Sequence, residues 1–291
     1  MSASSHYAAT KEEVHKDLMS LFDGSMYKDF SKWIKLGSNA DDGNIYATVW
    51  GLVKNVFDVF LIAGILLSLV YFVSYILDKV THQEVTIESM ARSILELALA
   101  LLLISNAWNV SQAFMNLGDA IYDETANTFS IESSGSNTAF IDDMYKDLTD
   151  DSDNFPVSIL KSTYLKLLYG TKYMPISIGT TIASVAMVAA GITRGVTIII
   201  YTIYFPLGIA NIYGNGLHSP GMRYMKKYAA ACISGAIMVA ISVAGQAIQV
   251  AILNTDGVSK VTGPIYSLAV TFVVVTMMFK SQSFANDIVG V

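Results

Sequence analysis

The feature that most constrains this chain is a series of long apolar stretches with almost no charged residue. The clearest, VFLIAGILLSLVYFVSYIL from Val59 to Leu77, contains no charged side chain. A helix crosses the hydrocarbon core of a bilayer with about 20 consecutive apolar residues. The whole chain is 53% hydrophobic and 14% charged, whereas a soluble domain is about 25% charged. The sequence therefore predicts an all-α, polytopic integral membrane protein.

About five transmembrane helices are expected, with one ambiguity. The apolar segments are Trp50–Leu77, Ile94–Leu117, Ser177–Tyr213, Tyr228–Leu253 and Pro264–Phe279. As a helix, the third would be about 55 Å long, against a bilayer core of about 30 Å. It is either one protruding helix or two spans that turn at Arg194. We favour five spans over six, because AAGITRGVT has few polar residues to cover a turn.

Four regions follow from this pattern: 1–49, 50–117, 118–173 and 174–291. In the first, Val14 and Leu18 recur at helical spacing. They indicate either a short helical subdomain or an interfacial helix on the bilayer with Trp33 as its anchor, and we favour the interfacial helix. The apolar positions after Pro156 predict a second interfacial helix that leads back into the membrane.

The third region, 118–173, is acidic. It carries ten Asp and Glu residues against four lysines. Its richness in Ser, Asp, Asn and Gly predicts an exposed extracytoplasmic loop. The acidic cluster lacks the ligand order and the terminal Glu of an EF-hand, so a solvated surface is expected rather than a calcium site.

The distribution of cations predicts the orientation. With five spans, one side of the membrane collects most of the Lys and Arg near span ends: Lys79, Arg92, Arg223, Lys226, Lys227 and Lys280. The short loop on the opposite side holds only Lys260. Cytoplasmic loops are enriched in Lys and Arg. We therefore expect a protein of the cell membrane with its N-terminus outside the cell and its C-terminus in the cytoplasm.

No pattern in the chain indicates an enzyme. The four histidines are scattered, and neither a phosphate-binding loop nor a nucleophile elbow is present. The turn GNGLHSPG has G-x-G spacing, but no strand precedes it. The single cysteine, Cys232, lies in an apolar segment and is expected to be an inert buried thiol. We predict no catalytic residue, no metal site and no cofactor.

Arg194 is the most deeply placed charge, flanked by Gly191 and Gly195. Ionisable groups inside a membrane usually mark function, whereas a G-x-x-x-G pair usually mediates helix packing. Several interpretations stay open: Arg194 pairs with Glu96 or Asp58, lines a hydrated interior, or lies at the outer surface on a projecting helix. We give the structural and the pore-lining roles equal weight. A ridge of small residues on the fourth span suits contact between helices or between subunits. Its members are Ala231, Gly235, Ser242 and Gly245.

One segment resembles a known family. A long apolar helix led by Arg194 is followed by FPLGIANIYGNGLHSPGMRYMKKYAAACISGAIMVAI. This resembles the TrbL family, the polytopic membrane subunit of conjugative type IV secretion systems and the sixth of the VirB series. The matching features are Arg194, Pro206, the turn Gly214–Gly221 and the helix start Tyr224–Tyr228. The short chain is similar to members from Gram-positive conjugative elements.

The resemblance implies a non-enzymatic channel or assembly subunit that helps to move a DNA–protein substrate across the cell membrane. Its implied partners are cytoplasmic ATPases, surface or pilus components and further copies of itself in a ring. The basic loop would contact lipid headgroups first, or else an acidic partner or transferred DNA. Its residues are His218, Arg223, Lys226 and Lys227. The alternative function is a secondary transporter or ion channel that uses intramembrane charges.

Overall fold

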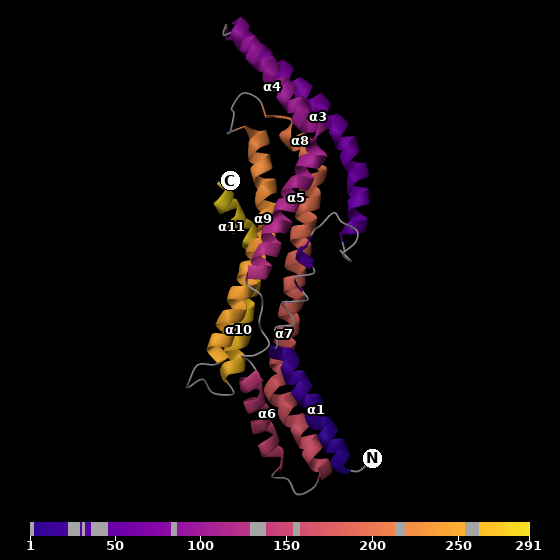
Figure 1. The fold of residues 1–291 in the computed structure, drawn as a ribbon, viewed down its shortest axis with the longest axis vertical. Coiled ribbons are helices and arrows are strands. Elements are labelled where there is room, and N and C mark those ends of the chain that lie inside the picture. The colour runs from indigo at the N-terminus through magenta and orange to yellow at the C-terminus, as the bar shows by residue number, and fades with distance from the viewer. Residues whose placement is uncertain are drawn as a thin grey trace. The chain divides into compact units, whose positions relative to one another are not determined.

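The computed structural model describes residues 3–22, 30, 33–35, 46–82, 86–128, 138–153, 158–212, 219–253 and 262–291. Every regular element in these ranges is a helix (Figure 1). The prediction of an all-helical fold is confirmed for this part of the chain.

The helices form two compact units, each with its own core. The first consists of Met1–Lys32, Ala126–Ala190 and Val239–Phe279. The second consists of Trp33–Thr125, Gly191–Met238 and Lys280–Val291. The long helices α7 and α9 contribute residues to both units.

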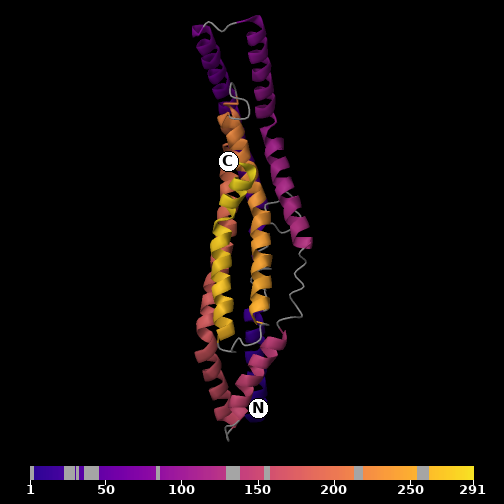
Figure 2. The same ribbon diagram turned by 90° about the vertical axis from the view of Figure 1, so that its left-hand side faces the viewer.

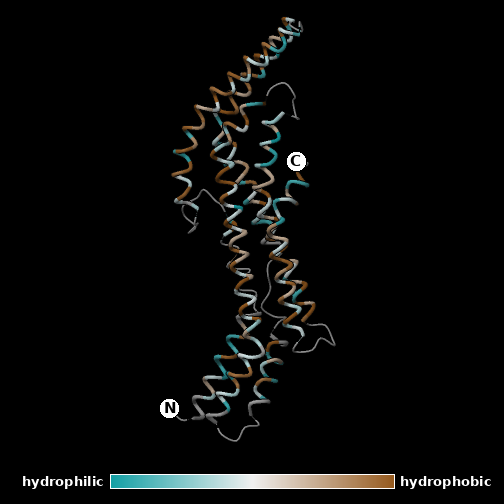
Figure 3. Tube along the Cα trace, turned by 180° about the vertical axis from the view of Figure 1, so that it is seen from behind, coloured by the Kyte–Doolittle hydropathy of each residue, from teal (hydrophilic) through white to brown (hydrophobic). Residues whose placement is uncertain are grey.

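Four helices in the described part of the chain are long and apolar enough to cross a membrane. They are α3 (Ala47–Thr81), α7 (Ser158–Ile203), α9 (Pro220–Leu253) and α10 (Thr262–Phe279). Many of their large apolar side chains face outward: Leu52 is 68% exposed and Ile62 is 64% exposed. Figure 3 shows long apolar stretches on these helices. Since water would disfavour such surfaces, the chain is a multi-pass membrane protein.

The expected second span, Ile94–Leu117, is not one of these four. It is divided at Asn106 between α4 (Ile87–Ser105) and α5 (Ala107–Thr128). The Asn106 side chain donates to the Leu102 carbonyl at 3.0 Å, and its own N–H closes the last turn of α4. Asparagine competes in this way with the continuing backbone hydrogen bonds. The predicted span Ile94–Leu117 is therefore shared by two helices that meet at Asn106.

The third span is one continuous helix. α7 has 46 residues and is about 69 Å long. It is helical on both sides of Arg194, so the six-span alternative with a turn there does not apply. Because α7 begins at Ser158, the predicted second interfacial helix and the third span are the same helix. It ends at Ile203, before the short α8 (Phe205–Ile209), and not at Tyr213.

In the first unit, α1 (Ala3–Phe22) lies beside α6 (Thr138–Asp153), as Figure 1 shows. Val14 and Leu18 of α1 are buried against α6 and the first part of α7. The apolar side of α1 that we expected on the bilayer is thus covered by protein. The other members of this core are Ile141, Met144, Leu148, Leu165, Tyr173, Ile176 and Leu253.

α6 corrects the prediction of an exposed acidic loop. Within the acidic region, Ile141, Met144 and Leu148 recur at helical spacing and are fully buried. The acidic side chains take the opposite faces, and Asp142 meets His15 at 3.0 Å. The composition of the region obscured a three-residue apolar stripe that defines an amphipathic helix.

The second half of α9 packs on α10 in the same unit. A Cβ added at Gly245 would collide with the Val274 side chain, so the helices approach closely there. The Gln249 amide donates to the Ser267 hydroxyl. Ser242, which is also buried, donates to the Val239 carbonyl. This half of the small-residue ridge therefore mediates helix packing within the chain.

The second unit contains the antiparallel hairpin of α3 and α4, together with α5, α8, the first half of α9 and α11 (Ser281–Val289) (Figure 2). Its core is rich in aromatic residues, among them Trp50, Phe57, Phe205 and Tyr228. A Cβ at Gly64 would lie 2.8 Å from the Pro206 carbonyl oxygen. Glycine at this position lets α3 contact the backbone of α8.

Candidate functional site

Arg194 is the centre of a buried polar cluster in the second unit. Its side chain is 5% exposed. Nη1 donates to the Ile34 carbonyl at 2.6 Å, and Nη2 donates to the Cys232 carbonyl at 2.8 Å. Nε donates to the Ser234 hydroxyl at 3.2 Å. Each guanidinium nitrogen thus has an acceptor, as a buried arginine requires.

Glycines make the space that this cluster occupies. A Cβ at Gly235 would lie 2.5 Å from Cζ of Arg194. A Cβ at Gly195 would lie 2.5 Å from the Tyr46 hydroxyl oxygen, and one at Gly118 would lie 2.5 Å from the Cys232 carbonyl oxygen. Real Cβ atoms do not approach other atoms so closely, so a larger residue at any of the three positions would force its neighbours to move. The glycines admit the guanidinium, a phenol ring and a neighbouring helix.

The electrostatic surroundings of Arg194 are mostly neutral. Its three acceptors are uncharged, although Asp119 of α5 is near enough to interact with it electrostatically. Burial raises the pKa of the Tyr46 phenol, while the positive charge of Arg194 acts in the opposite direction. Tyr46 stays protonated at neutral pH and donates to the Trp33 carbonyl at 3.5 Å. Carbonyl and hydroxyl dipoles therefore supply the direct stabilisation of this cation.

This geometry joins three separate parts of the chain. Ile34 lies before the first candidate span, Arg194 lies on α7, and Cys232 and Ser234 lie on α9. Beside them, Lys35 forms an ion pair of 2.9 Å with Asp123 of α5. The arrangement favours the structural interpretation of Arg194, because its donors are directed at protein acceptors rather than at a pathway. The Gly191 position beside it is also buried.

A tyrosine cluster extends the same core along α9. The Tyr228 hydroxyl lies 3.0 Å from the Thr202 hydroxyl and donates to the Ser111 carbonyl at 3.2 Å. The Tyr224 hydroxyl donates to the Tyr201 carbonyl at 2.7 Å. A Cβ at Gly208 would collide with the Tyr224 ring. These bonds fix the first turns of α9 against α5, α7 and α8.

The acidic partners expected for Arg194 lie elsewhere. Asp58 is exposed on α3, and Glu96 forms an ion pair of 3.3 Å with Arg92 on α4. Lys54, one turn before Asp58, lies over the Trp108 ring at 5.9 Å from its centroid. The hypothesis that Arg194 pairs with Asp58 or Glu96 is therefore wrong: its neighbours are backbone carbonyls and a serine.

The predicted basic loop is partly the first turns of α9. Arg223 and Lys227 are exposed and Lys226 is half-buried, on the side of the helix away from the buried tyrosines. Ser219 begins this helix, with its hydroxyl accepting from the Met222 N–H at 3.2 Å. His218 lies outside the described residues. The cations are thus available at one end of a candidate span.

The first half of the small-residue ridge also has its partners within the chain. Ala231 is buried in the aromatic core, and its carbonyl accepts from the Ser234 hydroxyl at 2.7 Å. Gly235 faces the guanidinium of Arg194. We expected the ridge to mediate contact between helices or between subunits. In the structure, both halves of the ridge pack against helices of the same chain.

Sequence reasoning missed most partners of Arg194. Ser234 precedes Gly235 of the small-residue ridge but was not itself singled out. The Ile34 and Cys232 carbonyls had no sequence signal, since every residue carries a carbonyl. Gly118 and Gly64 stand alone in apolar segments, without the spacing that drew attention to Gly191 and Gly195. Comparisons of the chain with protein families, curated proteins and solved structures find no match.

Proposed function

We propose that this protein is a channel or assembly subunit of a conjugative type IV secretion machine in the cell membrane. In this role it helps a DNA–protein substrate to cross and works with cytoplasmic ATPases, surface or pilus components and other copies of itself. The proposal combines the multi-pass architecture with the resemblance of the segment from Arg194 to Gly245 to the TrbL family.

The observation that carries the proposal is the packing of the resembling segment. Its distinctive residues do not lie scattered along two helices. Pro206 contacts Gly64, Tyr224 and Tyr228 close around Phe205, and Arg194 bonds to α9. These contacts support the proposal, because residues of the resembling segment meet in the core of the second unit.

The packing of α1 on α6 supports the five-span topology. Both helices bury residues in one core, so both lie on the same side of the membrane. The chain between them must then cross an even number of times. α3 supplies one crossing, and α4 with α5 would supply the return.

Two features of α4 and α5 suit such a crossing. They contain 19 and 22 residues and are together about 60 Å long, twice the bilayer core. Leu95, Leu99 and Leu102 of α4 are each about 60% exposed, as lipid-facing residues would be. With α7, α9 and α10 this makes five spans. The distribution of cations then favours an N-terminus outside the cell and a C-terminus in the cytoplasm.

The alternative of a transporter or ion channel finds less support at Arg194. A cation that binds a moving substrate needs free donors facing a hydrated space. All three guanidinium nitrogens of Arg194 already donate to protein groups. We therefore prefer the secretion subunit.

The decisive experiment is deletion of the gene followed by a mating assay. Transfer of a marked conjugative element should fall to background and return when the wild-type gene is supplied. Arg194→Ala should restore transfer poorly, and Lys146→Ala, an exposed change on α6, should restore it fully. Unimpaired transfer after deletion would refute the conjugation function.

A further inference from the structure

The α3–α4 hairpin contains a second polar site, separate from the Arg194 cluster. A cavity of about 370 Å³ lies between the end of α3 and the beginning of α4. Two cations and two carboxylates line it: Lys79, Arg92, Glu88 and Glu96. The remaining lining residues are Tyr75, Thr86 and Ser89. The cavity thus presents equal numbers of positive and negative groups.

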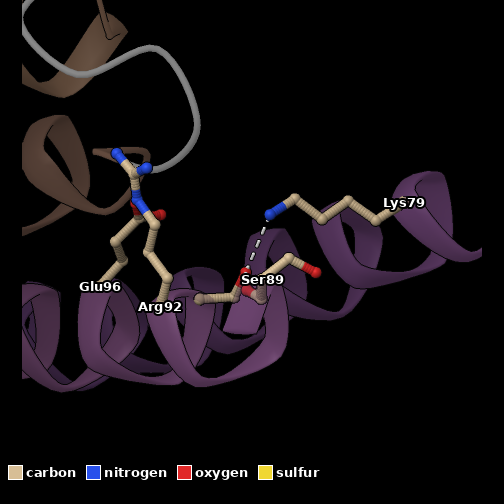
Figure 4. Close-up of polar contacts among 5 residues, drawn as sticks. Lys79, Ser89, Arg92 and Glu96 are labelled. Atoms are coloured by element: carbon tan, nitrogen blue, oxygen red, sulfur yellow. Dashed lines mark hydrogen bonds and ion pairs between the residues drawn. The ribbon is translucent and has the colours of Figure 1, made fainter. Parts of the chain in front are cut away.

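The groups in this cavity are held in place by local bonds. Lys79 lies over the Tyr75 ring at 4.5 Å and donates to the Ser93 hydroxyl at 3.1 Å. Arg92 and Glu96 form an ion pair of 3.3 Å, and Figure 4 shows these two side chains next to each other. The Thr86 and Ser89 hydroxyls bond reciprocally to the N–H groups of the first turn of α4. Both cations are therefore positioned before any ligand arrives.

The two carboxylates differ in their access to the cavity. Oε2 of Glu96 is enclosed by the protein, so a ligand cannot reach it. Glu88, another lining residue, is exposed, and its carboxylate can accept from an ammonium group. On the same side, Arg92 is 81% exposed, so its remaining N–H groups are free to meet an anion.

The position of the cavity indicates which layer of the bilayer would surround it. It lies at the end of α3, a candidate membrane span, where apolar side chains point outward. Leu77 is 60% exposed, Leu95 61% and Ile87 92%. A polar cavity bordered by outward apolar residues at the end of a span matches the headgroup layer of a bilayer.

We propose that this cavity binds the headgroup of a zwitterionic aminophospholipid. Lys79 and Arg92 hold its phosphate, and the exposed carboxylate of Glu88 accepts from its primary ammonium. The acyl chains lie along the outward apolar residues of α3 and α4. This inference requires that α3 spans the membrane, but it does not depend on a role in conjugation.

Headgroup chemistry makes the assignment specific. A primary ammonium donates hydrogen bonds, whereas the quaternary ammonium of phosphatidylcholine does not. Phosphatidylglycerol keeps the phosphate but has no cation for Glu88. The site should therefore prefer phosphatidylethanolamine to both.

The test is native mass spectrometry of the delipidated full-length protein with each of the three lipids. Phosphatidylethanolamine should bind roughly tenfold more tightly than the other two, as expected for charge-assisted hydrogen bonds. Lys79→Ala and Arg92→Ala should each weaken its binding roughly tenfold, and Lys146→Ala should not change it. Glu88→Gln should remove the preference for phosphatidylethanolamine over phosphatidylglycerol while binding of both persists.

Two controls separate lipid binding from misfolding and from simple phosphate binding. The melting temperature of each variant in detergent shows whether it folds, and Arg92→Lys, which keeps the charge, should bind better than Arg92→Ala. Inorganic phosphate at the lipid concentration should fail to displace the lipid, because it lacks acyl chains. Equal binding of the three lipids, full binding by Lys79→Ala, or displacement by inorganic phosphate would each overturn the proposal.

Discussion

Gly235 leaves the space that the Arg194 guanidinium fills. A Cβ at Gly235 would lie 2.5 Å from Cζ of Arg194 and 2.6 Å from Nη2. The two residues are on different helices, α9 and α7, so this fit sets how closely the helices approach. A buried cation with three neutral acceptors has little freedom to shift without losing a hydrogen bond.

We expect Gly235→Ala to destabilise the protein by about 1–3 kcal/mol, because the added methyl displaces the guanidinium from its acceptors. The measurement is thermal unfolding in detergent. Gly170→Ala is the matched control, since nothing lies within 4 Å of a Cβ there. Gly170→Ala, which lies on α7, should leave the free energy of unfolding unchanged or slightly higher, because alanine favours the helix more than glycine does. Equal melting temperatures for both variants would contradict the fit described above.

Arg194→Met should release the segment around Ile34. Methionine fills much of the arginine volume but leaves the Ile34 carbonyl without this donor, at a cost of about 1–3 kcal/mol. Limited trypsin digestion should then cut faster at Lys35 than in the wild type. Cleavage at an unchanged rate would show that Arg194 does not anchor this segment.

The five-span topology can be tested by cysteine labelling. On a Cys232→Ala background, Lys16→Cys on α1 and Lys146→Cys on α6 should both react with an impermeant reagent added outside intact cells. Lys280→Cys should react only after permeabilisation. A four-span topology, in which α4 and α5 do not cross, would instead place Lys16 and Lys280 on one side and Lys146 on the other.

The contact between α1 and α6 depends on Leu18, whose side chain is fully buried. Leu18→Ala should cost about 2–5 kcal/mol, the usual range for a truncated core leucine. Hydrogen exchange should then speed up along α1 and α6. The exposed Lys16→Ala on the same helix serves as the control and should leave exchange unchanged.

The Lys35–Asp123 pair predicts a defined pH dependence. Its hydrogen bond to Asp123 raises the pKa of the Lys35 ammonium above 10.5, against an opposing effect of burial. A raised folded-state pKa of a cation gives stability that is present below the unfolded pKa and is lost as pH rises through the folded one. The pair is half exposed, so its contribution is at most about 1 kcal/mol.

We therefore expect the stability difference between wild type and Lys35→Ala to be constant from about pH 6 to about pH 9 and to shrink only above the ordinary lysine pKa. Urea unfolding at a series of pH values measures it. A difference that already disappears near neutral pH would rule out the raised lysine pKa as its source.

Membrane spans were predictable because hydropathy reflects a physical requirement of the bilayer. α3, α7, α9 and α10 all satisfy it over long uninterrupted stretches. The break at Asn106 was not predictable from hydropathy, since it arises from one side chain that caps the preceding turn. α6 was missed because its buried apolar stripe contains only three residues and the sequence around them is acidic.

The Arg194 cluster, too, was only partly predictable from the sequence. The arginine and its neighbouring glycines were recognisable from residue type and spacing. The partners were not, because two are main-chain carbonyls contributed by distant segments. Which carbonyl meets a buried guanidinium depends on the tertiary fold and leaves no mark on the residue that supplies it.

The use of main-chain acceptors has a consequence for how this sequence can vary over evolutionary time. Any amino acid at position 34 or 232 still offers the oxygen that Arg194 needs, so these positions are free to change provided that their side chains pack. The constraint falls on Arg194 itself, on the Ser234 hydroxyl and on the three glycines around them. Related proteins could therefore diverge widely around an unchanged arginine and still keep its hydrogen bonds to the segment around Ile34 and to α9.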